Sequence, residues 1–340
     1  MVFAEARRTG VKGAADLNGS KPRILVLGFL VVLAVSVTCG QQKKAAQVDP
    51  NKYAVIINGP GGEAAYTKQF EEWTDQLKSV LSDRYGFDAK HITAPRATAE
   101  EVKSTFATLK NHLDANNVLY LFLIGHGSFD GKESKFNLTG PDLSASEYNA
   151  LLSSLPTKRV VVFNMSSASG EFIKSLAAKG RIVVTATRNG QETNATRFTG
   201  FFISALNATD ADTDQDGHTS VLEAFVYANR LTGDFYKRAG RLATEHALID
   251  DNGDGVGHEK VEAGEGLLAR ATYLDSLSID EAAATAATGK LLKERTRLEG
   301  EIEQLIARKS NMPEAEYEAA LERLFIELAK VNRSIKQAGT

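Results

Sequence analysis

Cysteine is almost absent from this chain of 340 residues, which contains only Cys39. A single thiol excludes a disulfide within the chain and a zinc site built from several cysteines. Cys39 directly follows an apolar run that we interpret below as a targeting segment. The part of the chain that is expected to fold therefore contains no cysteine that could act as a nucleophile. An excess of basic residues is also absent: 40 Lys and Arg stand against 43 Asp and Glu, and they are scattered. We therefore expect no nucleic-acid partner.

Residues 1–40 have the pattern of a targeting segment. Residues 24–38 are apolar throughout, follow Lys21 and Arg23, and fall short of the about 20 residues of a membrane span. This pattern predicts a signal peptide or membrane anchor, and so an exported, periplasmic or envelope-associated protein. A lipid on Cys39 is an alternative membrane attachment, although Ser36 and Thr38 depart from the usual lipoprotein signal. Residues 41–52 are polar and predict a linker.

Strand-like and helix-like segments alternate between residues 53 and 275. Apolar runs predict strands at Tyr53–Asn58, Ala89–Ile92, Val118–Ile124, Arg159–Phe163, Arg181–Thr185 and Glu245–Ile249. Helical periodicity predicts helices at Tyr66–Arg84, Ala99–Leu113, Ser144–Ser154, Glu171–Ala178 and from Thr199 onward. The alternation predicts an α/β fold, a doubly wound and mostly parallel sheet with helices on both faces.

Polar loops follow four of the predicted strands, at Gly59–Gly62, Gly125–Gly127, Asn164–Gly170 and Thr185–Gln191. The carboxyl ends of parallel strands share one edge of the sheet, and ligands bind in the crevice beyond it. This edge is therefore the candidate site. His126 and the Ser-Ser-Ala-Ser-Gly turn at residues 166–170 are its candidates for a base and a nucleophile.

The order of these motifs resembles that of the caspase/legumain-like cysteine peptidases. One strand ends in Gly-His-Gly, and the next ends in Ser-Ala-Ser-Gly before a helix, within a resemblance that spans roughly Tyr53 to Asp251. The resemblance implies that His126 is the catalytic histidine and that Ser167 stands where the family carries its cysteine. It also implies that residues 186–193 form the substrate pocket, with Arg188 favouring an acidic P1 residue and Glu192 a basic one. Asn58 is a further candidate for substrate binding.

Several functions stay open for the His126–Ser167 pair. A serine hydroxyl ionises far less readily than a thiol, so it needs a strong base that a third polar group orients. No such acidic group stands out, and we therefore favour a degenerate enzyme that binds peptide or protein partners without cleaving them. An active serine-type hydrolase is one alternative. Ordinary strand-to-loop turns without chemistry are another, as is an envelope scaffold that acts through the C-terminal segment.

The segment Asp212–Glu223 has the sequence DTDQDGHTSVLE and the ligand spacing of an EF-hand loop. The expected oxygen ligands of a structural Ca²⁺ are Asp212, Asp214, Asp216, the His218 carbonyl, Ser220 and Glu223. An acidic surface turn is the alternative interpretation. The segment Asp250–Gly257 matches only in part: Asp250, Asn252 and Asp254 have the spacing, but Val261 cannot close the shell.

Residues 276–340 form a separate region, in which 276–289 predict a tether. Two apolar stripes flank the turn at Ser310–Pro313; they comprise Leu291, Leu298, Ile302 and Leu305, then Tyr317, Leu321, Leu324, Leu328, Val331 and Ile335. The second stripe has a/d spacing, and together the stripes predict an antiparallel, coiled-coil-like helical hairpin. Because Phe325 and Ile326 widen its apolar face, we expect oligomerisation or partner docking here, with a self-contained hairpin as the alternative.

Overall fold

The computed structural model describes residues 48–213, 218–261 and 266–274, scattered residues between 290 and 309, and residues 312–338. The predicted targeting segment, most of the linker and tether, and Asp214–Gly217 of the predicted calcium loop lie outside these residues. Within the described residues, no helix has the length and apolar character needed to cross a membrane.

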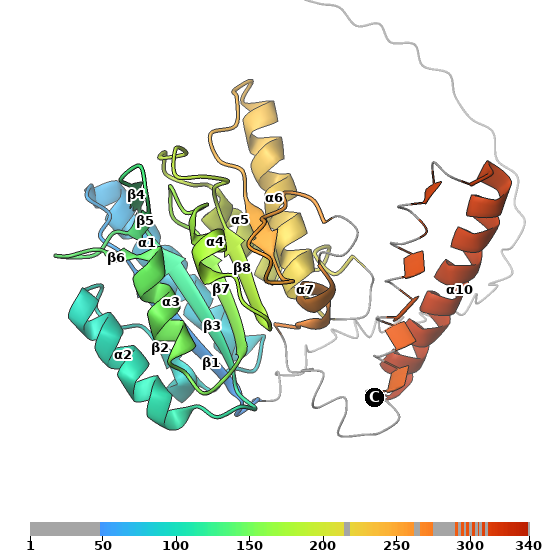
Figure 1. The fold of residues 1–340 in the computed structure, drawn as a ribbon, viewed down its shortest axis with the longest axis horizontal. Coiled ribbons are helices and arrows are strands. Elements are labelled where there is room, and N and C mark those ends of the chain that lie inside the picture. The colour runs from blue at the N-terminus through green and yellow to red at the C-terminus, as the bar shows by residue number, and fades with distance from the viewer. Residues whose placement is uncertain are drawn as a thin grey trace, which may run out of the picture. The chain divides into compact units, whose positions relative to one another are not determined.

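Six strands form the main sheet, in the order β2-β1-β3-β7-β8-β9. They are β1 (Lys52–Asn58), β2 (Ile92–Thr93), β3 (Val118–Ile124), β7 (Arg159–Asn164), β8 (Arg181–Thr185) and β9 (Leu248–Asp250). Every pairing is parallel except that of β8 with β9. The predicted mostly parallel sheet is therefore confirmed (Figure 1).

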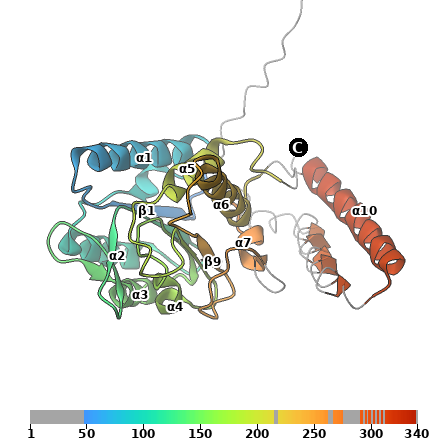
Figure 2. The same ribbon diagram turned by 90° about the horizontal axis from the view of Figure 1, so that it is seen from above.

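Helices cover both faces of this sheet because successive strand residues point to opposite sides. Ala54 and Ile56 pack into one core with α1 (Ala64–Asp83), α5 (Phe198–Asn207), α6 (Val221–Arg238) and α7 (Leu267–Ala271). Val55 and Ile57 pack into the other core with α2 (Ala99–His112), α3 (Ala145–Ser153) and α4 (Phe172–Leu176). Figure 2 shows the two helix layers with the sheet between them, which confirms the doubly wound architecture.

The helices begin where polar side chains satisfy their first backbone N–H groups. Capping boxes start α3 at Ser144 and α6 at Ser220. Two buried carboxylates that are distant in sequence also accept hydrogen bonds from the first N–H groups of a helix. Glu245 accepts hydrogen bonds from the first N–H groups of α5, and Asp251 accepts from those of α7. Tertiary contacts, as well as local sequence, therefore set where these two helices begin.

Two predicted strands were placed wrongly. Ala89–His91 is a 3₁₀ helix, because the Asp88 side chain accepts a hydrogen bond from the Lys90 N–H and closes a turn; only Ile92–Thr93 pairs as β2. The strand predicted at Glu245–Ile249 begins three residues later and ends one residue later, at Leu248–Asp250, and it runs antiparallel to β8. The small antiparallel sheet of β4 (Gly127–Phe129), β5 (Ser134–Phe136) and β6 (Leu143–Ser144) was not predicted.

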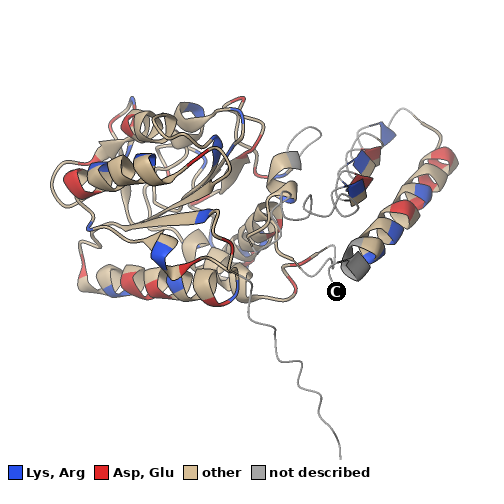
Figure 3. Ribbon diagram, turned by 90° about the horizontal axis from the view of Figure 1, so that it is seen from below, with Lys and Arg blue, Asp and Glu red and all other residues tan. Residues whose placement is uncertain are grey.

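The C-terminal region contains the long helix α10 (Glu314–Ala338). Leu298 and Ile302 pack against Leu324, so the two predicted apolar stripes do meet. Phe325 and Ile326 remain about half exposed, at 51% and 49%. Figure 3 shows that this helix carries both acidic and basic residues.

Candidate functional site

Four parallel strands end side by side at the carboxyl edge of the sheet. The backbone register pairs Asn58 with Ile124, Leu123 with Asn164, and Asn164 with Thr185. The loops that carry His126, Ser167 and Arg188 therefore leave from adjacent strand ends. The topology brings the predicted site residues to one edge, as the sequence predicted.

His126 follows β3 and is half-buried against α1. Its Nε2 lies 3.2 Å from the carbonyl oxygen of Gly61, and its ring meets Tyr66 and Phe70 edge-on, with 5.1 Å between centroids in each case. A carbonyl oxygen only accepts, so Nε2 is the protonated nitrogen in this arrangement. The imidazole is thus held by the loop after β1 and by two aromatic side chains of α1.

Ser167 is buried and bonded to the backbone rather than to His126. Its side chain accepts a hydrogen bond from the Gly127 N–H at 3.1 Å and donates one to the Gly127 carbonyl at 3.1 Å. Only 2% of the residue is exposed. Among the described residues, no hydrogen bond joins the Ser167 hydroxyl to the His126 ring. A nucleophile needs its base within hydrogen-bond reach and a route for substrate, and Ser167 has neither here.

The turn around Ser167 is covered by the loop after β8. The N–H of Ala168 donates to the Glu192 carbonyl at 2.8 Å, and the N–H of Ser169 donates to the Thr187 hydroxyl at 2.7 Å. Gly170 lies so close to the Arg188–Asn189 backbone that a Cβ there would overlap it. Ala168 adopts a left-handed φ of 52°, which is costly for a residue with a Cβ. These contacts close the turn instead of opening it to a ligand.

Arg188 and Glu192, the two candidates for substrate charge selection, are bonded to each other. The Glu192 carboxylate accepts from the Arg188 N–H at 2.9 Å and from Nε at 3.2 Å. His246 lies against the same carboxylate, and Glu259 lies 3.7 Å from the Arg188 guanidinium. Burial raises the pKa of Glu192, but the hydrogen bonds from Arg188 and His246 outweigh it and leave the pKa lowered. Glu192 is thus an ionised anchor for the loop.

A surface cavity of about 480 Å³ adjoins this cluster. It is lined by Arg188, Leu248, Gly257, His258, Glu259 and Lys260. Charges of both signs therefore face it. Sequence analysis missed His246 and this cavity, because His246 is 54 residues from Glu192 and no local pattern links them.

Asn58, the third substrate-binding candidate, ends β1 at the same edge. Its side-chain oxygen is buried and has no hydrogen-bond partner among the described residues. An unsatisfied buried acceptor is costly and rare in folded proteins. Of the predicted substrate-binding residues, Asn58 is therefore the one whose side-chain oxygen lacks a hydrogen-bond donor among the described residues.

The described part of the predicted calcium loop is organised by Glu223. One oxygen of its carboxylate accepts from the Thr213 N–H at 2.8 Å, and the other accepts from the Ser220 N–H at 2.9 Å. The last residue of the loop thus joins its second residue, Thr213, to its ninth, Ser220. The structure thus uses both Glu223 oxygens as hydrogen-bond acceptors within the protein, and calcium binding by Asp212, the His218 carbonyl, Ser220 and Glu223 stays a prediction. Asp214 and Asp216 lie outside the described residues, within which no cluster of three acidic, His or Cys side chains could hold a metal.

The second acidic run is a loop closed by its own backbone. Asp250 accepts from the N–H groups of Gly253 and Gly255, and Asn252 and Asp254 bond to each other and to following N–H groups. Burial raises the pKa of Asp250, against the effect of these hydrogen bonds. These hydrogen bonds order the run as a turn, and a second calcium site here stays a prediction.

The comparisons with known proteins concern the fold alone. No family model matches the chain, and no curated protein matches it by sequence. A structural-genomics target from Geobacter sulfurreducens is 14% identical over 59% of this chain and 93% of its own, with a TM-score of 0.41. Caspase-1 from Spodoptera frugiperda is 12% identical over 61% and 88%, with a TM-score of 0.41. The Drosophila initiator caspase Dronc is 11% identical over 62% and 83%, with a TM-score of 0.42. Similarity at this level assigns no role to any residue here.

Proposed function

We propose that this protein is a caspase/legumain-like peptidase homologue that binds a peptide or protein segment without cleaving it. The observation that carries the proposal is the state of Ser167: 2% exposed, and bonded through its hydroxyl to Gly127 instead of His126. A serine-type hydrolase would need that hydroxyl exposed and paired with the imidazole. The geometry favours the degenerate enzyme over this alternative.

The carboxyl edge offers a place for a bound segment. The cavity beside Arg188 presents Glu259 and Lys260 as well, so it suits a peptide that carries both charges. Arg188 is 48% exposed although it is paired, so its guanidinium can exchange one carboxylate for another at modest cost.

Binding and cleavage can be measured together on one peptide library. We expect fluorescence anisotropy to detect peptides that bind, and mass spectrometry to find those peptides intact afterwards. Arg188→Ala should weaken binding at least 5-fold, whereas Lys110→Ala, an exposed cation on α2, should leave it unchanged. Cleavage that disappears in Ser167→Ala would establish the hydrolase instead. The absence of any binding peptide would contradict the proposal.

Calcium and location complete the proposal. Asp212, Asp214, Asp216, the His218 carbonyl, Ser220 and Glu223 would hold a Ca²⁺ that joins the start of α6 to the preceding loop. The apolar residues 24–38 favour export to the cell envelope, with lipid on Cys39 or an uncleaved anchor as the membrane attachment. Mass spectrometry of the mature chain distinguishes these forms.

The C-terminal region offers a second route to function, as an oligomerisation or docking arm of an envelope scaffold. The half-exposed pair Phe325 and Ile326 supports this role. Light scattering should show a smaller assembly after Phe325→Glu. An unchanged mass would count against the arm.

A further inference from the structure

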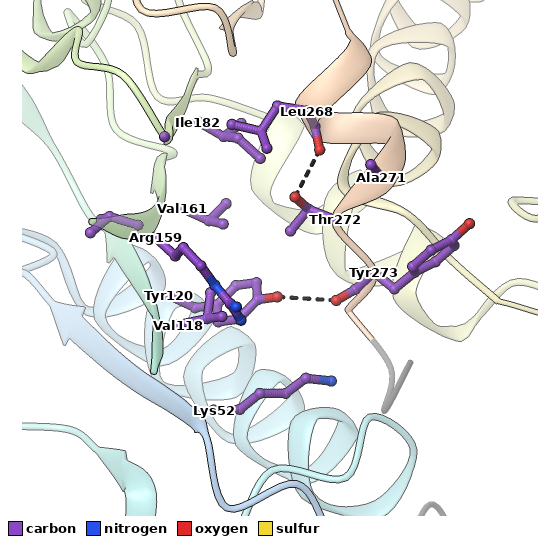
Figure 4. A pocket seen from close by; sticks show the side chains of 12 residues that line it. Lys52, Val118, Tyr120, Arg159, Val161, Ile182, Leu268, Ala271, Thr272 and Tyr273 are labelled. Carbon is purple, nitrogen blue, oxygen red and sulfur yellow. Dashed lines mark hydrogen bonds between the residues drawn. The ribbon is translucent and has the colours of Figure 1, made fainter. Parts of the chain in front are cut away.

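The C-terminal region follows a segment that is anchored at the amino-terminal edge of the main sheet. The Tyr120 hydroxyl donates to the Tyr273 carbonyl at 3.0 Å, as Figure 4 shows, and Lys52 Nζ donates to the Leu274 carbonyl at 3.1 Å. Lys52 is the first residue of β1, whereas His126 follows the last residue of β3. The chain after Leu274 therefore leaves the sheet at the end opposite to the candidate site.

The helix α10 of this region carries apolar side chains on two different sides. Leu324 is 6% exposed and packs against Leu298 and Ile302, whereas Phe325 and Ile326 are 51% and 49% exposed. Successive residues of an α-helix are about 100° apart around its axis, so Ile326 lies about 160° from Leu324. The side of α10 that faces away from Leu298 and Ile302 therefore has an apolar centre of its own.

The charged residues on that side are sorted along the helix. We call it the outer face, and its residues, all exposed, are Ala315, Glu318, Ala319, Glu322, Phe325, Ile326, Ala329, Lys330 and Arg333. Both acidic residues precede the apolar pair, and both basic residues follow it; Arg323, at the border of the face, is the exception. Among the described residues, none of Glu318, Glu322, Lys330 and Arg333 forms an ion pair. These four charges are therefore available to another surface.

The helix dipole does not account for this order of charges. The dipole favours acidic residues in the first turn of a helix and basic residues in the last, and its effect fades beyond those turns. Glu322 and Lys330 each lie eight residues from the nearer end of α10, which spans Glu314–Ala338. That distance is more than two turns, so the sorting of these two charges points to a partner surface.

We propose that α10 pairs in antiparallel orientation with α10 of a second copy of this chain, through the outer face. This inference rests on the proposed role of the arm in oligomerisation, and it names the partner. A twofold axis near Ile326 brings the apolar pair against its own copy. Glu322 and Lys330 lie four residues to either side of Ile326, so each meets the opposite charge of the other copy. A parallel pair would instead bring like charges together.

Analytical ultracentrifugation of the full chain measures this pairing, in a non-ionic detergent that suppresses association through the apolar residues 24–38. We expect the wild type to dimerise reversibly. Glu322→Lys and Lys330→Glu should each weaken dimerisation roughly 10-fold, because each places like charges together at two symmetry-related contacts. A chain with both substitutions should dimerise as the wild type does. Glu327→Lys, the same charge change at an exposed position off the outer face, should have no effect.

Mixing the two single variants gives a second readout. Chains with Glu322→Lys should associate with chains carrying Lys330→Glu more tightly than either variant associates with itself, because both contacts then join opposite charges. Circular dichroism and melting curves establish that each variant is folded. A monomeric wild type, single variants that dimerise normally, or a double variant as weak as the single ones would overturn the proposal.

Phe325→Glu separates this proposal from the more general role of the arm. If Phe325→Glu dissociates an assembly that the charge reversals leave intact, the arm does mediate association, and the antiparallel pairing through the outer face is wrong. If Phe325→Glu also leaves the assembly intact, both the pairing and the role of the arm are wrong.

Discussion

Replacing Ser167 with alanine should destabilise the protein, because its hydroxyl joins two strand ends. The Oγ both accepts from the Gly127 N–H and donates to the Gly127 carbonyl, each at 3.1 Å. A hydrogen bond within a protein contributes about 1 kcal/mol net. In Ser167→Ala the N–H and the carbonyl of Gly127 both lose their partner. Because Gly127 is half-buried, water can reach these groups in part, and we expect the free energy of unfolding to fall by about 2 kcal/mol in total.

For a domain of this size, a loss of about 2 kcal/mol lowers the melting temperature by roughly 4–8 °C. Calorimetry or melting followed by circular dichroism measures this directly. Ser204→Ala is a matched control, because Ser204 is exposed and donates only to the Gly200 carbonyl of its own helix. The control should melt within about 1–2 °C of wild type, as surface substitutions change stability by about 0.5 kcal/mol or less. If Ser167→Ala is as stable as wild type, or more stable, the structural role of Ser167 is refuted. That result would indicate that Ser167 is kept for activity at the expense of stability.

Three further results are expected. The pKa of Glu192 is lowered in the fold, so its contribution to stability is present above the unfolded pKa near 4.3 and is lost as pH falls through the folded pKa. Glu192→Gln should therefore be less stable than wild type in urea unfolding at pH 7 and should converge with it in acid; a difference that stays constant with pH would contradict this. Calcium should raise the melting temperature of wild type but not of Glu223→Gln; Glu147→Gln, at the matching capping position of α3, should keep the calcium response, and a response retained by Glu223→Gln would remove the metal site. Gly170→Ala should cost at least 2 kcal/mol in urea unfolding, because the added Cβ overlaps the Arg188 backbone; a neutral effect would show that the loop is not closed.

Long apolar runs made much of the sheet predictable. The runs Val118–Ile124 and Arg181–Thr185 are strands with the predicted bounds, because buried parallel strands are apolar on both faces. Short elements were not predictable in this way. The three residues of Gly127–Phe129 pair as β4 only because Ser134–Phe136 lies opposite them.

The location of the candidate site could be predicted from the topology of the sheet, but the hydrogen bonds within the site could not. Neighbouring strand ends at one edge were predicted, and the structure has them. Whether Ser167 faces His126 depends on contacts between residues distant in sequence, such as the 40 residues from Gly127 to Ser167. The same holds for His246, which lies 54 residues from Glu192 and joins its ion pair with Arg188. The sequence pattern specifies which residues reach the edge, and tertiary packing decides which of them pair.

The central claim, that Ser167 is a structural residue and not a nucleophile, is tested most directly with a fluorophosphonate probe. The probe reacts covalently with an activated serine hydroxyl, so labelling reports activation whatever the natural substrate is. We predict no labelling of Ser167 in the full chain, with or without calcium. Labelling of the wild type that disappears in Ser167→Ala would contradict this account and identify the protein as a serine hydrolase.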